Sequence, residues 1–248
     1  MSGRVRAGEK RSGSALHAYF ADLAELRGAE HGLLGSLFLY PAEEEIAELT
    51  TAAGRLRRMH EVARGFPFWP PLRDVLDGLE NMSDEAREEL GEEYVDLFLA
   101  GASPAPCPPY ESAYVGGGTR MGLVGVQVER AYAGGGFGLA SPGELPDHVA
   151  LELAFLSLLC CEEAHGWRTG EIEPAAGWLE HERAFHERHL QRWLPVFARR
   201  LSLATAPTSF YRKLAQAVHA FVVHDRGLIE ALLGVCSVDR AVHRGSAA

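Results

Sequence analysis

The sequence has no uninterrupted apolar stretch of the roughly 18 residues that a membrane-spanning helix requires. Its most apolar segment, Val149–Cys161, is too short and contains Glu152. The polar N-terminus, Met1–Gly13, is not followed by the apolar region of a secretory signal. We therefore expect no stable membrane insertion and a chain that stays in the cytoplasm.

Cysteine is scarce, and basic residues are fewer than acidic ones. The four cysteines, Cys107, Cys160, Cys161 and Cys236, form no Cys-x-x-Cys pair, so reduced thiols are expected rather than a disulfide framework. The chain has 24 Lys and Arg against 34 Asp and Glu, which gives a formal net charge of −10. Because nucleic-acid backbones are bound by clustered basic side chains, this balance argues against a nucleic-acid partner and is compatible with a basic one.

The signatures of common enzymes are also missing. The sequence contains no GxxxxGK[ST] loop, no GxGxxG between a strand and a helix, and no GxSxG elbow. The runs Gly116–Gly118 and Gly134–Gly136 lack flanking strands and are predicted to be flexible loops. No cofactor and no resident metal are expected.

Histidines nevertheless leave one alternative open, a metal-binding helical bundle. Its candidate ligands are His181, His186, His189 and Glu162. His181 and His186 would lie about 140° apart on a helix, whereas His186 and His189 could share an ion. His189 lies four residues from both Phe185 and Trp193, on an apolar stripe. A hydrogen-bonded, half-buried His189 is the interpretation we favour.

Alternating strand patterns are absent, and the apolar spacing is helical along most of the chain. We predict an all-α protein of about nine to eleven helices, in two unequal parts joined by a Gly- and Pro-rich hinge. The predicted boundaries are 1–13 and 239–248 for disordered tails, 14–238 for the helical domain, 14–133 and 147–238 for its two parts, and 134–146 for the hinge.

Several helices can be placed approximately. They are expected over 14–26, 30–39, 42–63, up to about 79, 83–98, 122–132, 147–165, 173–203 with a bend near Pro195, and 208–233. Ser83 is a suitable N-cap, because its hydroxyl can accept a hydrogen bond from the first turn. The helix after Asp147 is apolar almost all round and should lie at the centre of the fold.

Tyr94–Phe98 is the first of three clusters that go beyond helical spacing. It closes an acidic helix, because Glu80–Asp96 contains eight acidic residues and one basic residue. The aromatic side chains are consistent with core packing as well as with a functional role. The acidic face is consistent with plain solvation as well as with attraction of a basic partner.

The other two clusters lie on either side of the Gly-rich region. In Pro108–Tyr114, two prolines hold the backbone extended and present polar and aromatic side chains. In Pro146–Glu152 a helix begins, with Asp147 at its positive end and with His148 and Glu152 spaced to pair on one face. The polar and aromatic members of the two clusters are Tyr110, Glu111, Ser112, Tyr114, Asp147, His148 and Glu152.

With the three clusters in this order, the sequence resembles the TorD/DmsD family of cytoplasmic chaperones for molybdenum-cofactor redox enzymes. The matching motifs are Tyr94-xx-Leu97-Phe98, Pro109-Tyr110-Glu111-Ser112-x-Tyr114, Pro146-Asp147-His148, Glu152-Leu153-x-Phe155, Phe185-xxx-His189-Leu190-xx-Trp193 and Phe210-Tyr211-xx-Leu214. The resemblance spans residues 30–233. The Tyr-Glu-Ser and Asp-His segments are its specific parts.

The resemblance implies an all-helical chaperone without catalysis. Such a protein binds the apo catalytic subunit of a molybdenum oxidoreductase, often with its twin-arginine leader, until the cofactor is inserted, and so delays export. The hinge implies a domain-swapped dimer as an alternative to a monomer. The residues carried over as leader- or client-binding are Tyr94, Phe98, Tyr110, Glu111, Ser112, Tyr114, Asp147, His148 and Glu152.

The residues themselves give this expectation some support. A leader carries a basic pair followed by an apolar run, so its receptor needs carboxylates beside apolar or aromatic side chains. One alternative is a helical enzyme that uses Asp147, His148 and Glu152 as acid–base groups. No nucleophile or cofactor motif accompanies those three residues.

Overall fold

The computed structural model describes residues 2–59, 65–99, 105–115, 121–138, 143–170 and 172–245, without the side chains of 2–13, 121 and 239–245. The helices are α1 (Ser2–Ser36), α2 (Glu43–Met59), α3 (Trp69–Glu80), α4 (Asp84–Phe98), α5 (Met121–Gly134), α6 (Val149–Thr169), α7 (Ile172–Phe185), α8 (Gln191–Ala204) and α9 (Phe210–Gly245). A 3₁₀ turn, η2 (Glu111–Ala113), and a π-helix, η3 (His186–Leu190), complete the described elements. The predicted all-α class is confirmed, in a single domain.

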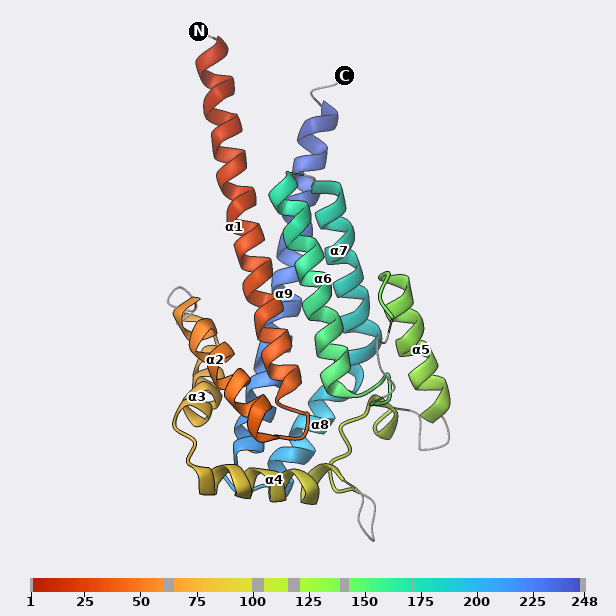
Figure 1. The fold of residues 1–248 in the computed structure, drawn as a ribbon. Coiled ribbons are helices and arrows are strands. Elements are labelled where there is room, and N and C mark those ends of the chain that lie inside the picture. Colours follow the sequence, from red (N-terminus) through yellow and green to blue (C-terminus); the bar gives the residue numbers. More distant parts are fainter. Residues whose placement is uncertain are drawn as a thin grey trace.

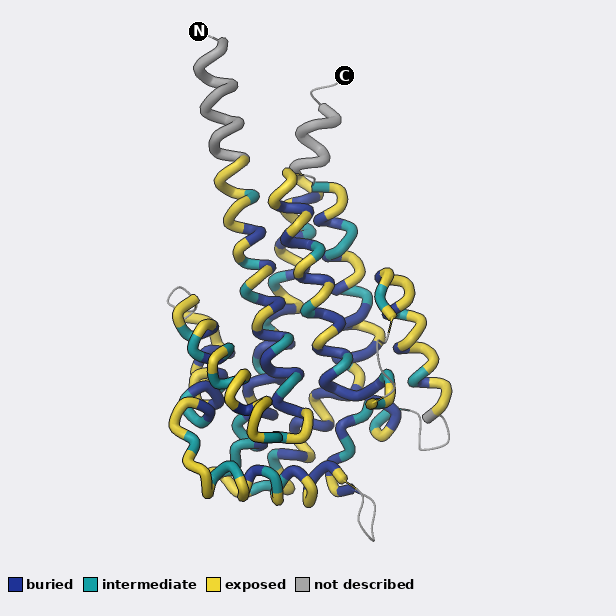
Figure 2. Tube along the Cα trace, viewed as in Figure 1, coloured by how far each residue is buried: buried dark blue, intermediate teal, exposed yellow. Residues whose placement is uncertain are grey.

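Four helices form the long upper bundle of the molecule. Figure 1 shows α1, α6, α7 and α9 running side by side, with α4 across the lower end and α5 at one edge. α1 packs along α6, α6 along α7, and α9 against α3, α7 and α8. The buried residues follow the centre of this bundle down to α4, as Figure 2 shows. α6 is the predicted central helix, because twelve of its residues are buried.

α1 is one continuous helix where the sequence predicted a tail and two helices. The break predicted before Glu30 is wrong, because Gly28 lies inside α1 and lets it approach α6 closely: a Cβ there would meet the Ser157 carbonyl oxygen at 3.2 Å. The Ser157 hydroxyl also donates a 2.7 Å hydrogen bond to the Gly28 carbonyl. Ser36 ends the helix well before Pro41.

Both termini also differ from the predicted disordered tails at 1–13 and 239–248. The helical backbone of α1 begins at Ser2, and that of α9 continues to Gly245. No proline occurs in either extension, so nothing removes a backbone donor from these helices. Residues 1 and 246–248 lie outside the described residues.

The bend predicted near Pro195 stays a prediction, but the regular α-helix is interrupted before this residue. The π-helix η3 follows α7 directly and ends five residues before Pro195, and Pro195 itself lies inside α8. Short π segments inside α-helices are found mostly where a functional or packing requirement changes the direction of side chains. The hinge over 134–146 stays a prediction, because 139–142 lie outside the described residues. The Ser83 cap is confirmed: its hydroxyl accepts from the Ala86 N–H at 3.2 Å.

The contact between α6 and α7 depends on a missing side chain at Gly166. A Cβ there would lie 2.8 Å from the Ala175 backbone nitrogen, a distance that real Cβ atoms do not adopt. We expect Gly166→Ala to lower the free energy of unfolding by about 1–3 kcal/mol, because the two helices must separate. Gly177→Ala is the control, since a Cβ at this half-buried α7 position meets nothing within 4 Å. Denaturant unfolding should show that variant stabilised by about 0.5–1 kcal/mol, and equal effects of both changes would contradict the packing argument.

Candidate functional site

The segment before η2 is fastened to the start of α6 by backbone hydrogen bonds. Tyr110 and His148 form an isolated antiparallel bridge. The Glu111 N–H donates to the Asp147 carbonyl at 2.9 Å, and the Val149 N–H donates to the Pro109 carbonyl at 2.9 Å. The structure therefore brings together the two motif clusters that the sequence analysis singled out, and we call this place the motif junction.

Side chains strengthen the motif junction at both of its ends. A carboxylate oxygen of Asp147 accepts from the Ser112 N–H at 2.9 Å. His148 is the N-cap of α6, and its Nδ1 accepts from the Ala150 N–H at 3.1 Å. Burial lowers the pKa of His148 to about 4, so the ring is neutral at physiological pH. Asp147 lies at the start of the helix as predicted, and His148 is its cap. The predicted pairing of His148 with Glu152 is wrong, because Glu152 contacts Trp193 instead.

Two acidic side chains lie buried beneath this backbone. Glu111 contacts Nδ1 of His189 at 2.8 Å, and Glu152 accepts from the Trp193 indole N–H at 3.1 Å. Burial, followed by the nearby charge of Glu111, raises the pKa of Glu152 well above its ordinary value. The predicted hydrogen-bonded His189 is confirmed, and at 5% exposure it is more deeply buried than expected.

The four aromatic candidates divide into two groups. Tyr110 and Tyr114 are half-buried, and the Tyr110 hydroxyl donates to Glu144 at 2.8 Å. Tyr114 stacks on the ring of Trp193 at 5.6 Å between centroids. Tyr94 and Phe98 are only 4% and 3% exposed and pack in the main core, with ring centroids 5.0 Å apart. Core packing therefore accounts for Tyr94 and Phe98.

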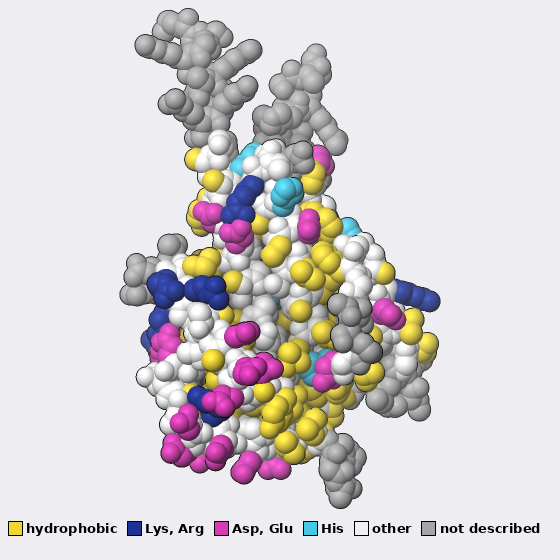
Figure 3. Space-filling view, viewed as in Figure 1, with side chains coloured by type: hydrophobic (Ala, Val, Ile, Leu, Met, Phe, Trp, Pro, Cys, Tyr) yellow, Lys and Arg dark blue, Asp and Glu magenta, His cyan; other side chains and the backbone are white. Residues whose placement is uncertain are grey.

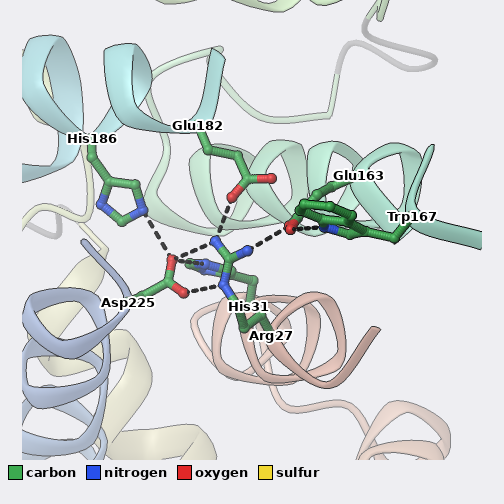
Figure 4. Close-up of polar contacts among 7 residues, drawn as sticks. All are labelled: Arg27, His31, Glu163, Trp167, Glu182, His186 and Asp225. Carbon is green, nitrogen blue, oxygen red and sulfur yellow. Dashed lines mark hydrogen bonds and ion pairs between the residues drawn. The ribbon is translucent and has the colours of Figure 1, made fainter. Parts of the chain in front are cut away.

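A second buried polar cluster was missed by the sequence analysis. Figure 4 shows Arg27 of α1 surrounded by three carboxylates from α6, α7 and α9. Its Nε lies 2.5 Å from Asp225, its Nη1 2.6 Å from Glu163, and its Nη2 also pairs with Glu182. The only sequence signal is the presence of charged residues on apolar helix faces. We call this group, with His31, His186 and Trp167, the Arg27 network.

Asp225 contacts three members of the Arg27 network, namely Arg27, His31 and His186. Burial alone would raise its pKa, but Arg27 and then His31 hold the pKa of Asp225 well below the ordinary value. Both histidines approach the same Asp225 oxygen, His31 at 3.0 Å and His186 at 3.2 Å. An ionised carboxylate only accepts, so each ring must donate from Nε2. Burial lowers the pKa of His31, which favours its neutral form.

The metal hypothesis can be tested on this geometry. His186 and His189 do not share a site, because one contacts Asp225 and the other Glu111. Instead His31, His186 and Asp225 place one potential ligand atom each within 4.8 Å of one another. An ion there would need an unprotonated Nε2 on both histidines, but both Nε2 atoms carry the proton that they donate to Asp225. The ion would also face the positive Arg27 guanidinium. The arrangement favours an ion-pair network over a metal centre.

Comparison with known proteins now identifies the family. The family model described as "Nitrate reductase delta subunit" matches residues 60–199, more than half of the chain. The chain belongs to this family. The residues matched by the family model include the motif junction and most of α6 to α8. The resemblance to TorD chaperones that the sequence motifs indicated is thereby confirmed.

Individual relatives of this family member have chaperone names. Chaperone protein TorD of Vibrio cholerae is 26% identical over 220 residues, which cover 85% of this chain and 95% of TorD. The chlorate reductase assembly chaperone protein of Ideonella dechloratans is 35% identical over 117 residues, 46% of this chain and 58% of the relative. The selenate reductase assembly chaperone protein of Thauera selenatis is 41% identical over 69 residues, 27% of this chain and 34% of that protein.

A solved structure supports the fold. A candidate redox enzyme maturation protein from Archaeoglobus fulgidus superimposes with a TM-score of 0.51 at 22% identity, covering 82% of this chain and 93% of that chain. Within the described ranges, no helix is both long enough and apolar enough to cross a bilayer.

Proposed function

We propose that this protein is a system-specific maturation chaperone in the cytoplasm. It binds the apo catalytic subunit of a molybdenum-cofactor oxidoreductase, its twin-arginine leader, or both, so that the cofactor is inserted before export. The main observation behind the proposal is the sequence similarity of this chain to a TorD chaperone over 95% of the length of that chaperone. The chain acts by binding and not by catalysis, as a monomer or a domain-swapped dimer.

The motif junction supports a positioning role for most of the carried-over residues. Glu111, Ser112, Asp147, His148 and Glu152 are each at most 2% exposed, and each makes at least one hydrogen bond. The rival proposal, acid–base catalysis by Asp147, His148 and Glu152, would require these groups to reach a substrate. We propose instead that the buried groups hold the 109–115 segment in place, while Tyr110 and Tyr114 contact the client.

The lower end of the molecule offers a surface that fits a leader peptide. A groove of about 760 Å³ separates the α1–α2 connection from α4 and is lined by Glu43, Asp84, Glu88, Glu92 and one base, Arg87, together with Tyr40, Pro41, Ala42, Gly91 and Val95. Figure 3 shows acidic side chains at this end next to an apolar patch. The exposed apolar side chains of this region include Leu39, Tyr40, Val95 and Leu99. Carboxylates next to apolar surface are what a basic pair followed by an apolar run requires.

The client is identified by affinity purification of the tagged chain from its native host. The expected result is a co-purifying large subunit of a molybdenum oxidoreductase, recognised by mass spectrometry. Recovery of the chain without any such subunit from cells that express one would contradict the proposed function.

The leader surface is tested by charge reversal on α4. We expect Glu88→Lys with Glu92→Lys to weaken binding of a twin-arginine leader peptide at least tenfold at low salt, because both carboxylates line the groove. The matched control is Glu89→Lys with Asp96→Lys, two exposed acids of the same helix outside the groove lining. Calorimetric titration at two salt concentrations distinguishes the pairs. An equal loss in both would mean that only net charge attracts the peptide.

A further inference from the structure

A small groove lies between the start of α8 and the first half of α9, two helices that pack against each other. Figure 1 shows α8 beside the lower part of α9. The volume of the groove is about 240 Å³, less than the roughly 300–1,000 Å³ of pockets for drug-sized ligands, so its occupant is small. We call it the Pro195 groove, and its lining consists of Leu190, Gln191, Leu194, Pro195, His219, Val222, Val223 and Arg226.

The floor of the Pro195 groove is apolar. Leu190 and Leu194 are completely buried, and Val222 is 3% exposed. At the rim, the aliphatic side chain of Val223 is 60% exposed. An apolar group that covers these side chains is removed from water together with the rim, which is favourable. The groove therefore fits an aliphatic side chain.

Pro195 leaves one backbone acceptor of α8 without its regular partner. In an α-helix, the carbonyl oxygen of one residue accepts a hydrogen bond from the N–H four residues further along the chain. The residue four positions after Gln191 is Pro195, which has no N–H. Gln191 lines the groove and is only half-buried. Its carbonyl oxygen is thus available to accept from an N–H group of the occupant.

The polar side chains on the α9 wall of the groove are basic. Arg226 and His219 are both exposed there, and the lining contains no Asp or Glu. Among the described residues, no carboxylate forms an ion pair with either of them. In a chain of net charge −10, a basic wall without an acidic partner points to a negatively charged group on the occupant.

We propose that the Pro195 groove binds the C-terminal end of a partner polypeptide whose last residue is aliphatic, such as leucine. The terminal carboxylate would pair with Arg226, the N–H of the last residue would donate to the Gln191 carbonyl, and the aliphatic side chain would lie on the apolar floor. A free amino acid fits less well, because its ammonium group would lie beside a basic wall. This inference goes beyond the proposed chaperone function and does not depend on it.

The test is titration of the nitrogen-15-labelled full chain with small probes, followed by the amide chemical shifts in NMR spectra. N-acetyl-leucine has all three groups, N-acetyl-leucine amide lacks the carboxylate, and 4-methylpentanoate lacks the N–H. We expect N-acetyl-leucine to bind at least tenfold more tightly than its amide and at least threefold more tightly than 4-methylpentanoate. The largest shifts should occur at residues that line the groove. Equal binding of N-acetyl-leucine and its amide would overturn the proposal.

Pro195→Ala tests the role of the free carbonyl oxygen. Alanine supplies an N–H to the Gln191 carbonyl, and it is a good helix former at this exposed position, so the variant should fold. N-acetyl-leucine should bind the variant no more tightly than 4-methylpentanoate does, whereas the affinity for 4-methylpentanoate should stay within twofold of that of the parent chain. An unchanged preference for N-acetyl-leucine in the variant would show that this carbonyl takes no part, and would contradict the proposal.

Two matched pairs of variants separate the groove from general effects. Arg226→Gln should weaken binding of N-acetyl-leucine at least tenfold, whereas Arg199→Gln, at an exposed arginine of α8 outside the lining, should leave it within twofold. Val223→Trp should block the groove, whereas Val196→Trp, at a similarly exposed valine outside the lining, should not. Equal effects within either pair would overturn the proposal, as would shifts that map outside the groove or no binding at millimolar concentration. None of these outcomes depends on whether a client subunit co-purifies.

Discussion

Arg27→Ala is expected to lower the free energy of unfolding by about 3–5 kcal/mol, because it leaves buried charges without a partner. Arg27 is 2% exposed, and Glu163, Glu182 and Asp225 are completely buried. Burial raises the pKa of Glu163 and of Glu182, and Arg27 opposes that rise in each. Without the guanidinium, these groups must either stay charged in a dry environment or take up protons.

The measurement is denaturant unfolding of the purified variant at neutral and at acidic pH. The difference in the free energy of unfolding between the variant and the parent chain should become smaller toward low pH. Protonated carboxyl groups are neutral and do not need the Arg27 cation as a partner. Arg168→Ala is the control, since Arg168 pairs with Glu25 and Asp22 at the surface, where salt bridges contribute little. A loss after Arg27→Ala no larger than that of the control would show that the Arg27 network contributes nothing to stability.

The Arg27 network also shows where sequence reasoning ends. Arg27 and Asp225 are 198 residues apart, and helical periodicity gives the buried face of each helix but not which faces meet. A charged residue on an apolar face is visible in the sequence, but its partner depends on the packing of α1, α6, α7 and α9. His186 was singled out as a metal candidate for its spacing, yet its contact is made across helices with Asp225.

Local features were more predictable, because their causes are local. The Ser83 cap and the buried α6 follow from a hydroxyl beside a helix start and from apolar residues all round a helix. The break before Glu30 was wrongly predicted, because Gly28 serves close packing on Ser157 rather than a turn. The π-helix η3 was not predicted either, because its residues His186 and His189 contact Asp225 and Glu111, which are far away in the sequence.

The motif junction was found in part. The structure brings Glu111, Ser112, Asp147, His148 and Glu152 of the two sequence motifs together, and their role in binding stays a prediction. Their burial could not be foreseen, because it depends on the path of the 105–115 segment over α6 and α8. A short acidic and aromatic motif suggests a surface for a basic ligand, whereas here it joins two parts of the chain.

Glu152→Gln is expected to stabilise the protein at alkaline pH, by about 1–3 kcal/mol at pH 8. Glu152 is completely buried, and burial together with Glu111 raises its pKa well above the ordinary value of 4.5. As the pH rises above 4.5, the unfolded chain releases this proton while the folded chain retains it. The free energy of unfolding therefore falls by up to about 1.4 kcal/mol per pH unit until the pH passes the folded pKa.

Glutamine keeps the shape of the side chain and an oxygen that can accept from the Trp193 indole, but it cannot ionise. The advantage of the variant should therefore be small near pH 5 and should grow as the pH rises. Urea unfolding across pH 5–8 measures it, with the exposed Glu89→Gln of α4 as the control. Parallel stability curves for Glu152→Gln and the parent chain would mean that Glu152 is not held protonated by its neighbours. A gap that widens with pH would show that keeping Glu152 protonated in the folded chain lowers the stability of the protein at alkaline pH.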